Sequence, residues 1–407
     1  MAKKPNIRFA GFEDDWEQRK LPEFVSFFNG LTYTPDDVRK TGTLVLRSSN
    51  VKNGEIIDAD NVYVSEKVAT SENVQVGDII VVVRNGSRAL IGKHAQIKAF
   101  MPNTVIGAFM SGIRSEHPSF VNALLDTSAF ECEIAKNMGA TINQITGYMF
   151  SKMEFTIPSE EEQKKIGDYF RNLDHIITLH QRKCDELKKV KKFMLQKMFP
   201  KKGEKNPEIR FDGFTNDWEQ RKLGEVCSEI GDGLHSAPKY NDNGEVFFIN
   251  GNNLVDGHIV IDPLKTRRVS KETFEKNNKH LDNNTLLLSI NGTIGNLAYY
   301  QGEQVMLGKS IAYLKVNGID HFFLYTSLQT AEILNSFMIS LTGTTIKNLG
   351  LEAIKNTIIA VPKLEEQHKI GVYFSALDHL ITLHQRKCEE LKNVKKYMLQ
   401  NMFAKGE

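Results

Sequence analysis

Basic, amide and hydroxyl side chains gather in two Gly- and Asn-rich parts of the sequence. The first part contributes Arg47, Ser48, Asn50, Lys52, Arg84, Asn85, Ser87, Arg88, Lys93, Thr141 and Asn143. The second contributes His235, Ser236, Lys239, Tyr240, Asn250, Asn252, Asn253, Asn291, Thr293, Lys309, Thr344, Thr345 and Lys347. Arginine and lysine hydrogen-bond guanine, asparagine hydrogen-bonds adenine, and hydroxyls and amines hold phosphates. Each residue alone is more often a solvated loop residue, but together these types predict contacts to nucleic acid.

Motifs of catalysis are missing from the sequence. It holds no GxxxxGK[ST] loop for nucleotide hydrolysis and no GxGxxG after a strand. Adenine methyltransferases carry Asn-Pro-Pro-aromatic, from which Asn206-Pro207-Glu208 departs at its third residue. Pro35-Asp36-Asp37 begins like a nuclease motif, but no acid-x-Lys strand follows it. We therefore expect a chain that is not an enzyme and has no cofactor of its own.

Two His/Cys pairs have the spacing of metal ligands. His180 and Cys184, and likewise His384 and Cys388, lie four residues apart and so share a helix face. Two such pairs could complete a tetrahedral zinc site. However, all four residues fall on the apolar stripe described below, where cysteine is commonly buried for packing. The preferred interpretation is packing, with no metal site.

The elements that must position these residues belong to an internal repeat, which occurs twice in the chain. Residues 8–21 read RFAGFEDDWEQRKL and residues 210–223 read RFDGFTNDWEQRKL. Residues 161–200 and 365–404 are identical at 30 of 40 aligned positions. The stretches between these blocks differ in sequence but keep sparse landmarks, such as Arg47–Asn50 with Gly54 against Asn250–Asn253 with Gly257. Similar ends around divergent middles indicate one duplicated module with two different binding choices.

Each middle reads as a compact mixed α/β domain. Apolar runs separated by Asn, Gly and Ser turns predict strands at 79–83, 246–249, 286–290 and 310–316. Helical patterns cover 120–136 and 322–340. The repeated Phe-Gly-Phe-Trp pattern (Phe9 to Trp16, Phe211 to Trp218) is interpreted as a structural clasp rather than a base-stacking surface.

A long helix follows each middle after Pro158 or Pro362. Apolar residues recur with a heptad pattern over about five repeats, which is typical of a coiled coil. The expected seam residues are Ile166, Phe170, Leu173, Ile177, Leu187, Ile370, Phe374, Leu377, Ile381 and Leu391. At 1.5 Å per residue each helix spans about 60 Å. Matching stripes on one chain favour an antiparallel, pseudo-two-fold pair; the alternative is that each helix packs only on its own domain.

Composition and charge place few limits on function. The chain has 407 residues, 41% of them hydrophobic, and a formal net charge of +2, so any DNA contact must come from local patches. Four cysteines without a CxxC pair suit a reducing compartment. Neither a signal core nor an apolar run of membrane-spanning length is present. We therefore expect a cytoplasmic protein without a membrane partner.

The repeated RF-x-GF-x-x-DWEQRKL and LHQRK-C-x-ELK blocks, with Gly231-Asp-Gly-Leu-His235, resemble the specificity subunits of type I restriction–modification enzymes. The resemblance covers both repeats, although the Gly-Asp-Gly-Leu-His motif occurs only in the second. It implies that each middle is a target recognition domain and each helix a spacer. Two modification subunits would clasp the helices and methylate adenines with their own S-adenosylmethionine. Restriction subunits are optional further partners.

The resulting prediction is an α+β protein that reads a bipartite, asymmetric double-stranded DNA target. Two mixed α/β target recognition domains are related by a pseudo-two-fold and joined by two long antiparallel coiled-coil helices. The expected boundaries are 1–158 (first domain), 159–200 (first helix), 201–209 (linker), 210–362 (second domain) and 363–404 (second helix). A stand-alone DNA-binding regulator would work without a methyltransferase, and a duplicated protein-binding adaptor would show no sequence preference on DNA. Both stay open as alternatives.

Overall fold

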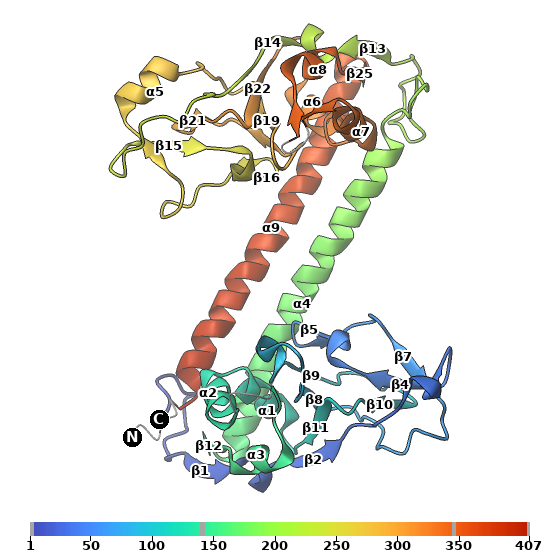
Figure 1. Ribbon diagram of the computed structural model, residues 1–407, viewed down its shortest axis with the longest axis vertical. Helices are drawn as coiled ribbons and strands as arrows, with labels where there is room; N and C mark the ends of the chain where they lie inside the picture. The colour runs from blue at the N-terminus through green and yellow to red at the C-terminus, as the bar shows by residue number, and fades with distance from the viewer. Residues whose placement is uncertain (1–3, 139–142, 344–346, 405–407) are drawn as a thin grey trace. The chain divides into compact units, whose positions relative to one another are not determined.

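The structure, a computed structural model, describes residues 4–138, 143–343 and 347–404. It divides into two compact units: unit 1 comprises residues 1–181 and 386–407, and unit 2 comprises residues 182–385. Each unit joins the α/β part of one repeat to segments of both long helices (Figure 1). The expected boundaries kept each helix in a segment of its own, whereas the contacts divide each helix between the units.

Among the described residues, unit 1 contains two four-stranded sheets, two two-stranded sheets (β1 with β12, β5 with β6) and three short helices. Its strands are β1 (Glu17–Lys20), β2 (Ser26–Asn29), β3 (Val38–Arg39), β4 (Thr43–Leu46), β5 (Val51–Lys52), β6 (Glu55–Ile56), β7 (Val62–Val64), β8 (Ile79–Val82), β9 (His94–Gln96), β10 (Thr104–Ile106), β11 (Met110–Arg114) and β12 (Glu154–Ile157). Its short helices are α1 (Pro118–Leu125), α2 (Ser128–Asn137) and α3 (Gly147–Lys152). One four-stranded sheet has the antiparallel order β2-β11-β8-β9, and the other, β10-β4-β7-β3, contains the parallel pair β10 and β4.

Unit 2 repeats this plan. Its strands are β13 (Glu219–Lys222), β14 (Cys227–Asp232), β15 (Val246–Ile249), β16 (Leu254–Val255), β17 (His258–Ile259), β18 (Arg268–Val269), β19 (Thr285–Ser289), β20 (Leu297–Tyr299), β21 (Val305–Leu307), β22 (Ile311–Val316), β23 (Leu341–Thr342), β24 (Asn348–Leu349) and β25 (Ile358–Val361). Its short helices are α5 (Lys271–Asn277), α6 (His321–Ser327), α7 (Ala331–Ile339) and α8 (Leu351–Asn356). The order β14-β22-β19-β20 matches the first sheet of unit 1, and β18-β15-β21 again contains a parallel pair.

The expected strands are present within one residue at each end, because each is a buried apolar run. The two expected helical patches are each divided into two helices. In unit 1, Thr127 is buried between α1 and α2; its hydroxyl accepts from Phe130 N and donates to Leu124 O. A side chain that caps the second helix in this way ends the first one.

The long helices are α4 (Glu160–Lys197) and α9 (Leu364–Met402). Glu160 to Glu162 and Glu365 with Glu366 occupy the first turns, where acidic residues complement the helix dipole. Each helix start is also tied to its proline, since Gln163 Nε2 donates to Pro158 O and Gln367 Nε2 to Pro362 O.

Within each unit the two helix segments run antiparallel. In unit 1, Phe170 contacts Phe403 and the Cys388 thiol lies 4.0 Å from Ile177 O, so positions that rise along α4 fall along α9. In unit 2, Phe199 contacts Phe374 and Lys191 donates to Asp378, so the same relation holds there. The expected seam residues are buried, except that Ile177 and Leu391 are half-buried. The alternative in which each helix packs only on its own domain is therefore wrong.

A phenylalanine just after each long helix completes an aromatic cluster of the opposite repeat. In unit 1, Phe403 packs against Trp16, Phe120 and Phe170 at centroid distances of 5.6–6.4 Å. In unit 2, Phe199 packs in the same way against Trp218, Phe323 and Phe374 at 5.7–6.1 Å. Both tryptophans are buried, which confirms that the Phe-Gly-Phe-Trp pattern is structural. Arg8 and Arg210 fix these clasps by double hydrogen bonds to the buried carboxylates of Glu162 and Glu366.

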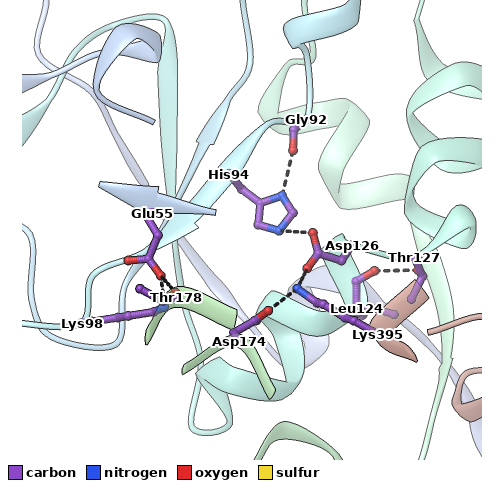
Figure 2. Close-up of polar contacts among 10 residues, drawn as sticks. All are labelled: Glu55, Gly92, His94, Lys98, Leu124, Asp126, Thr127, Asp174, Thr178 and Lys395. Atoms are coloured by element: carbon purple, nitrogen blue, oxygen red, sulfur yellow. Dashed lines mark hydrogen bonds and ion pairs between the residues drawn. The ribbon is translucent and has the colours of Figure 1, made fainter. Parts of the chain in front are cut away.

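A half-buried lysine also joins the helices in each unit. In unit 1, Lys395 of α9 donates to Asp126 and to Asp174 of α4, both at 2.7 Å, and His94 Nε2 lies 3.4 Å from Asp126 (Figure 2). Burial raises the pKa of the Asp174 carboxyl, and Lys395 opposes that shift. In unit 2 the equivalent Lys191 donates to Asp378 and Gln329. A lysine at a seam position is therefore tolerated because it pairs across the helices.

Replacing Lys395 by Met is expected to destabilise unit 1 by about 1–3 kcal/mol, because the half-buried Asp174 loses the cation that offsets its desolvation and Asp126 loses its ion pair. The measurement is chemical denaturation of the chain, with Lys396→Met as the matched control, since Lys396 is the exposed neighbour on the same helix. Equal midpoints for the two variants would show that the ion pairs of Lys395 contribute nothing to stability.

Candidate nucleic-acid interface

In unit 1, several strands end or begin at the same sheet edge. β11 begins beside the ends of β8 and β2, because Met110 pairs with Val82 and Ser111 pairs with Asn29. The parallel strands β4 and β10 both end toward Leu46 and Ile106, and Gly107 N donates to Leu46 O. The loops after β4, β8 and β10 therefore meet, and they carry most of the candidate residues of the first repeat.

Hydrogen bonds tie these loops together. Asn85 Nδ2 donates to Ser48 Oγ (3.2 Å), and Lys93 Nζ donates to Ser48 O (3.3 Å). Asn143 Nδ2 reaches Gly86 O (3.1 Å), and Ser87 N donates to Asn85 Oδ1. Ser48, Asn85, Ser87, Lys93 and Asn143 are thus brought together at the edge.

Other candidates of the first repeat are placed differently. The Asn50 side chain is fully buried; its Oδ1 accepts from Arg47 N and its Nδ2 donates to Ala59 O and Asn61 Oδ1. It caps the 3₁₀ turn Ser48–Asn50 and cannot reach a base. Arg47 is held by an ion pair to Asp60. Lys52 and Arg88 are exposed, on β5 and on the turn Arg88–Leu90, and Thr141 lies outside the described residues.

Unit 2 forms the same edge with different side chains. Ser289 of β19 and Asp232 of β14 pair with the first residues of β22, and Gly308 N donates to Ile249 O at the end of β15. Ser310 Oγ accepts from Gly251 N and donates to Asn250 Oδ1. Thr293 Oγ1 donates to Asn252 Oδ1, and Asn291 Nδ2 donates to Lys309 O, both at 3.4 Å. Asparagines and hydroxyls therefore dominate this surface.

The remaining candidates of the second repeat lie around this edge. Asn253 caps the turn Gly251–Asn253 as Asn50 does in unit 1. Its Oδ1 accepts a hydrogen bond from Asn250 N, and its Nδ2 donates to Val260 O. His235 and Ser236 follow β14, with His235 Nε2 2.7 Å from Asp232. Tyr240 pairs with Val269 and lies under the Arg267 guanidinium; Lys239 beside it is exposed. Lys347 is exposed, whereas Thr344 and Thr345 lie outside the described residues.

Two edge residues escaped the sequence analysis. Phe109 and Ser310 occupy equivalent positions, each two residues after the glycine that follows β10 or β21 (Gly107 and Gly308). Aligning these glycines would have found them. Among the described residues, Arg84, Lys309 and Lys347 form no ion pair with a carboxylate, whereas Arg47 does. Unpaired cations keep their charge available for an anionic partner.

The next question is whether the described residues include a metal-binding site. Among the described residues, no group of three or more His, Cys, Asp and Glu side chains is placed to hold a metal ion. The Cys388 thiol instead lies 3.7 Å from Gln181 Oε1. Within the same residues, no helix is long and apolar enough to cross a membrane.

The comparisons with known proteins define a class. Residues 13–189 and 215–393 each match the type I restriction modification DNA specificity domain. The StySPI specificity subunit of Salmonella potsdam is 22% identical over 390 residues, covering 88% of this chain and 81% of that relative. The putative MjaX specificity subunit of Methanocaldococcus jannaschii is 26% identical over 422 residues, covering 97% and 94%. An S subunit from M. genitalium has the same fold, with a TM-score of 0.69 at 14% identity over 99% of this chain and 100% of that one.

The chain therefore belongs to the type I restriction–modification specificity subunits. It carries two target recognition domains and is a non-catalytic component of its system.

Proposed function

We propose that the chain reads a bipartite, asymmetric DNA target and positions adenine methyltransferase (modification) subunits on it. The recognition domains would be residues 1–158 and 210–362, with residues 159–200 and 363–404 as spacer helices. Each domain would read one half-site with its strand-end loops. Restriction subunits would attach to the same assembly.

One observation carries this proposal. Equivalent strands form the same sheet edge in both units, but the side chains on that edge differ between the units. Unit 1 offers Arg84, Asn85 and Ser48, and unit 2 offers Asn250, Asn291 and Lys309. Equivalent backbones with different hydrogen-bonding groups fit the recognition of two different base sequences by one geometry.

Exposed apolar residues on the long helices favour binding of two partner subunits. Apolar side chains are exposed at four positions of α4 and at the four equivalent positions of α9. The pairs are Ile176 and Leu380, Leu179 and Leu383, Val190 and Val394, and Phe193 and Tyr397, each 40–57% exposed. Apolar residues that recur along one helix face mark a surface for a protein partner. Because both helices carry the set, we propose one modification subunit for each.

Point variants at the edge of unit 2 test the DNA contact. Asn291→Ala should relax one base position of one half-site, by about 1–3 kcal/mol of discrimination, because it removes a base-reading amide. Lys309→Ala should weaken binding to all sequences alike and reduce the salt dependence, because it removes a phosphate contact. The measurement is binding of the reconstituted chain–modification complex to duplexes carrying each single base change. Equal losses on every duplex from both variants would contradict the assignment of Asn291 as a base-reading residue.

A further inference from the structure

An exposed phenyl ring stands on the recognition edge of unit 1. Phe109 lies in the connection from β10 to β11, and 55% of it is exposed. The connection follows Gly107, whose N–H donates to Leu46 O at the end of β4. Phe109 is therefore next to the loops that hold Ser48 and Asn85. A phenyl ring left in water at this place gains free energy from any partner that covers it.

The ring is held in place from two sides. The Phe109 carbonyl accepts hydrogen bonds from Val83 N (3.0 Å) and Arg84 N (3.2 Å), which fix the backbone to the end of β8. The Arg84 guanidinium lies over the ring, 5.1 Å from its centroid, within the range of a cation–π contact. Since no described carboxylate pairs with Arg84, its hydrogen-bonding edge is free to meet a ligand.

We infer that Phe109 and Arg84 form a composite base-reading element, in which Phe109 contacts the 5-methyl group of a thymine. This inference rests on the proposed function and adds a specificity-determining residue to it. A guanidinium covers one face of the ring, so the ring cannot insert between two base pairs, which would occupy both faces. It can offer its free face and edge to an apolar group in the major groove, where the thymine methyl is that group. Arg84 beside it can hydrogen-bond O6 and N7 of a neighbouring guanine.

The equivalent positions of unit 2 do not form such an element. Ser310 stands at the position of Phe109, and its hydroxyl is occupied by Gly251 N and Asn250 Oδ1. Two half-sites read by such different chemistry would differ in sequence. The thymine contact is therefore expected in the first half-site alone.

The experiment uses the full chain reconstituted with its modification subunit and duplex oligonucleotides of the methylated target. The first half-site is the one lost when residues 22–158 are replaced. Each of its thymines is changed in turn to deoxyuridine, which removes only the methyl group. The wild-type complex should lose about fourfold in affinity at one thymine, the factor that corresponds to about 0.8 kcal/mol for burying one methyl group. Phe109→Ala should be insensitive to that change, whereas Phe109→Leu should keep part of the sensitivity.

Phe100→Ala is the matched control. Phe100 is 79% exposed in the same unit but follows β9, whose last residue pairs with the first residue of β8, at the opposite sheet edge. This variant should respond to deoxyuridine as the wild type does. The inference is overturned if Phe109→Ala keeps the full sensitivity, or if no thymine of the first half-site is sensitive in the wild-type complex. Failure of the proposed function would look different, because the wild-type complex would then show no sequence preference at all.

Discussion

Replacing residues 22–158 by residues 224–362 is expected to convert the methylated motif into an inverted repeat. Both recognition domains would then be the second one, and the first half-site would disappear from the motif. The helix segments run antiparallel in each unit. In the pseudo-two-fold arrangement predicted from the sequence, two identical recognition domains would be related by a two-fold axis. Two recognition domains related by such an axis read inverted half-sites, because B-DNA has two-fold axes perpendicular to its own axis.

The chimera should fold because the contacts at its junction are duplicated in the natural chain. Phe323 would meet Phe403 as it meets Phe199 in unit 2. Gln329, which accepts the Lys191 ammonium in unit 2, would accept Lys395 in place of Asp126. Trp16 and the strand β1 would be retained, and β25 would replace β12 as its partner.

The measurement is methylome sequencing of cells that carry the chimera and its modification subunit. A direct repeat of the second half-site would mean that the two recognition domains bind DNA in the same orientation, and it would contradict the two-fold. Persistence of the first half-site would show that residues 22–158 do not read it. The natural chain, sequenced in parallel, provides the bipartite motif and its gap for comparison.

Local sequence signals predicted four of the longer strands and the apolar seam of the helices. The run Ile79–Val82 is buried on both faces, and such runs are readable as strands. Asn53-Gly54 and Asp256-Gly257, all at positive φ, turn the hairpins β5–β6 and β16–β17, as Asn-Gly and Asp-Gly do in two-residue turns. These features depend on neighbours in sequence, so one chain suffices to find them.

Of the two landmark asparagines, Asn50 is buried and caps a backbone turn, and Asn253 caps the equivalent turn while remaining half-buried. Asn50 and Asn253 each lie three residues after a backbone N–H that they accept, a capping arrangement present in both repeats. An Asn shared by two divergent middles is better explained by a shared backbone turn than by base reading, because base-reading residues should differ between them. This argument was available in the sequence.

Contacts between distant segments were beyond sequence reasoning. Lys191 and Lys395 follow Cys184 and Cys388 by one heptad and so fall on the seam, but their partners Asp378 and Asp174 come from the other helix. The sequence alone does not show how a lysine on an apolar seam is accommodated, because its partner comes from a distant segment. Likewise, the similar ends of the two repeats give no sign of which domain receives Phe199 and which receives Phe403.

The exchanged helix ends lead to the second large expected effect. Phe199→Ala should destabilise unit 2 by about 3–5 kcal/mol, the range for removing a buried phenyl ring. Phe199 is buried against Trp218, Phe323 and Phe374, all of the second repeat, although it belongs to the first. The loss should therefore appear in the repeat that the mutated helix does not belong to. Phe403→Ala should produce the reciprocal loss in unit 1.

Hydrogen exchange followed by mass spectrometry separates the two units within one chain. Phe199→Ala should reduce amide protection in β14, β19 and β22 and leave β2, β8 and β11 unchanged, because local stability is reported segment by segment. Phe193→Ala and Tyr397→Ala are matched controls, since these rings sit on the same helices but are 51% and 57% exposed. They should change protection in neither unit. If Phe199→Ala instead loosened β2, β8 and β11, each helix end would be serving its own repeat, and the reciprocal clasp would be wrong.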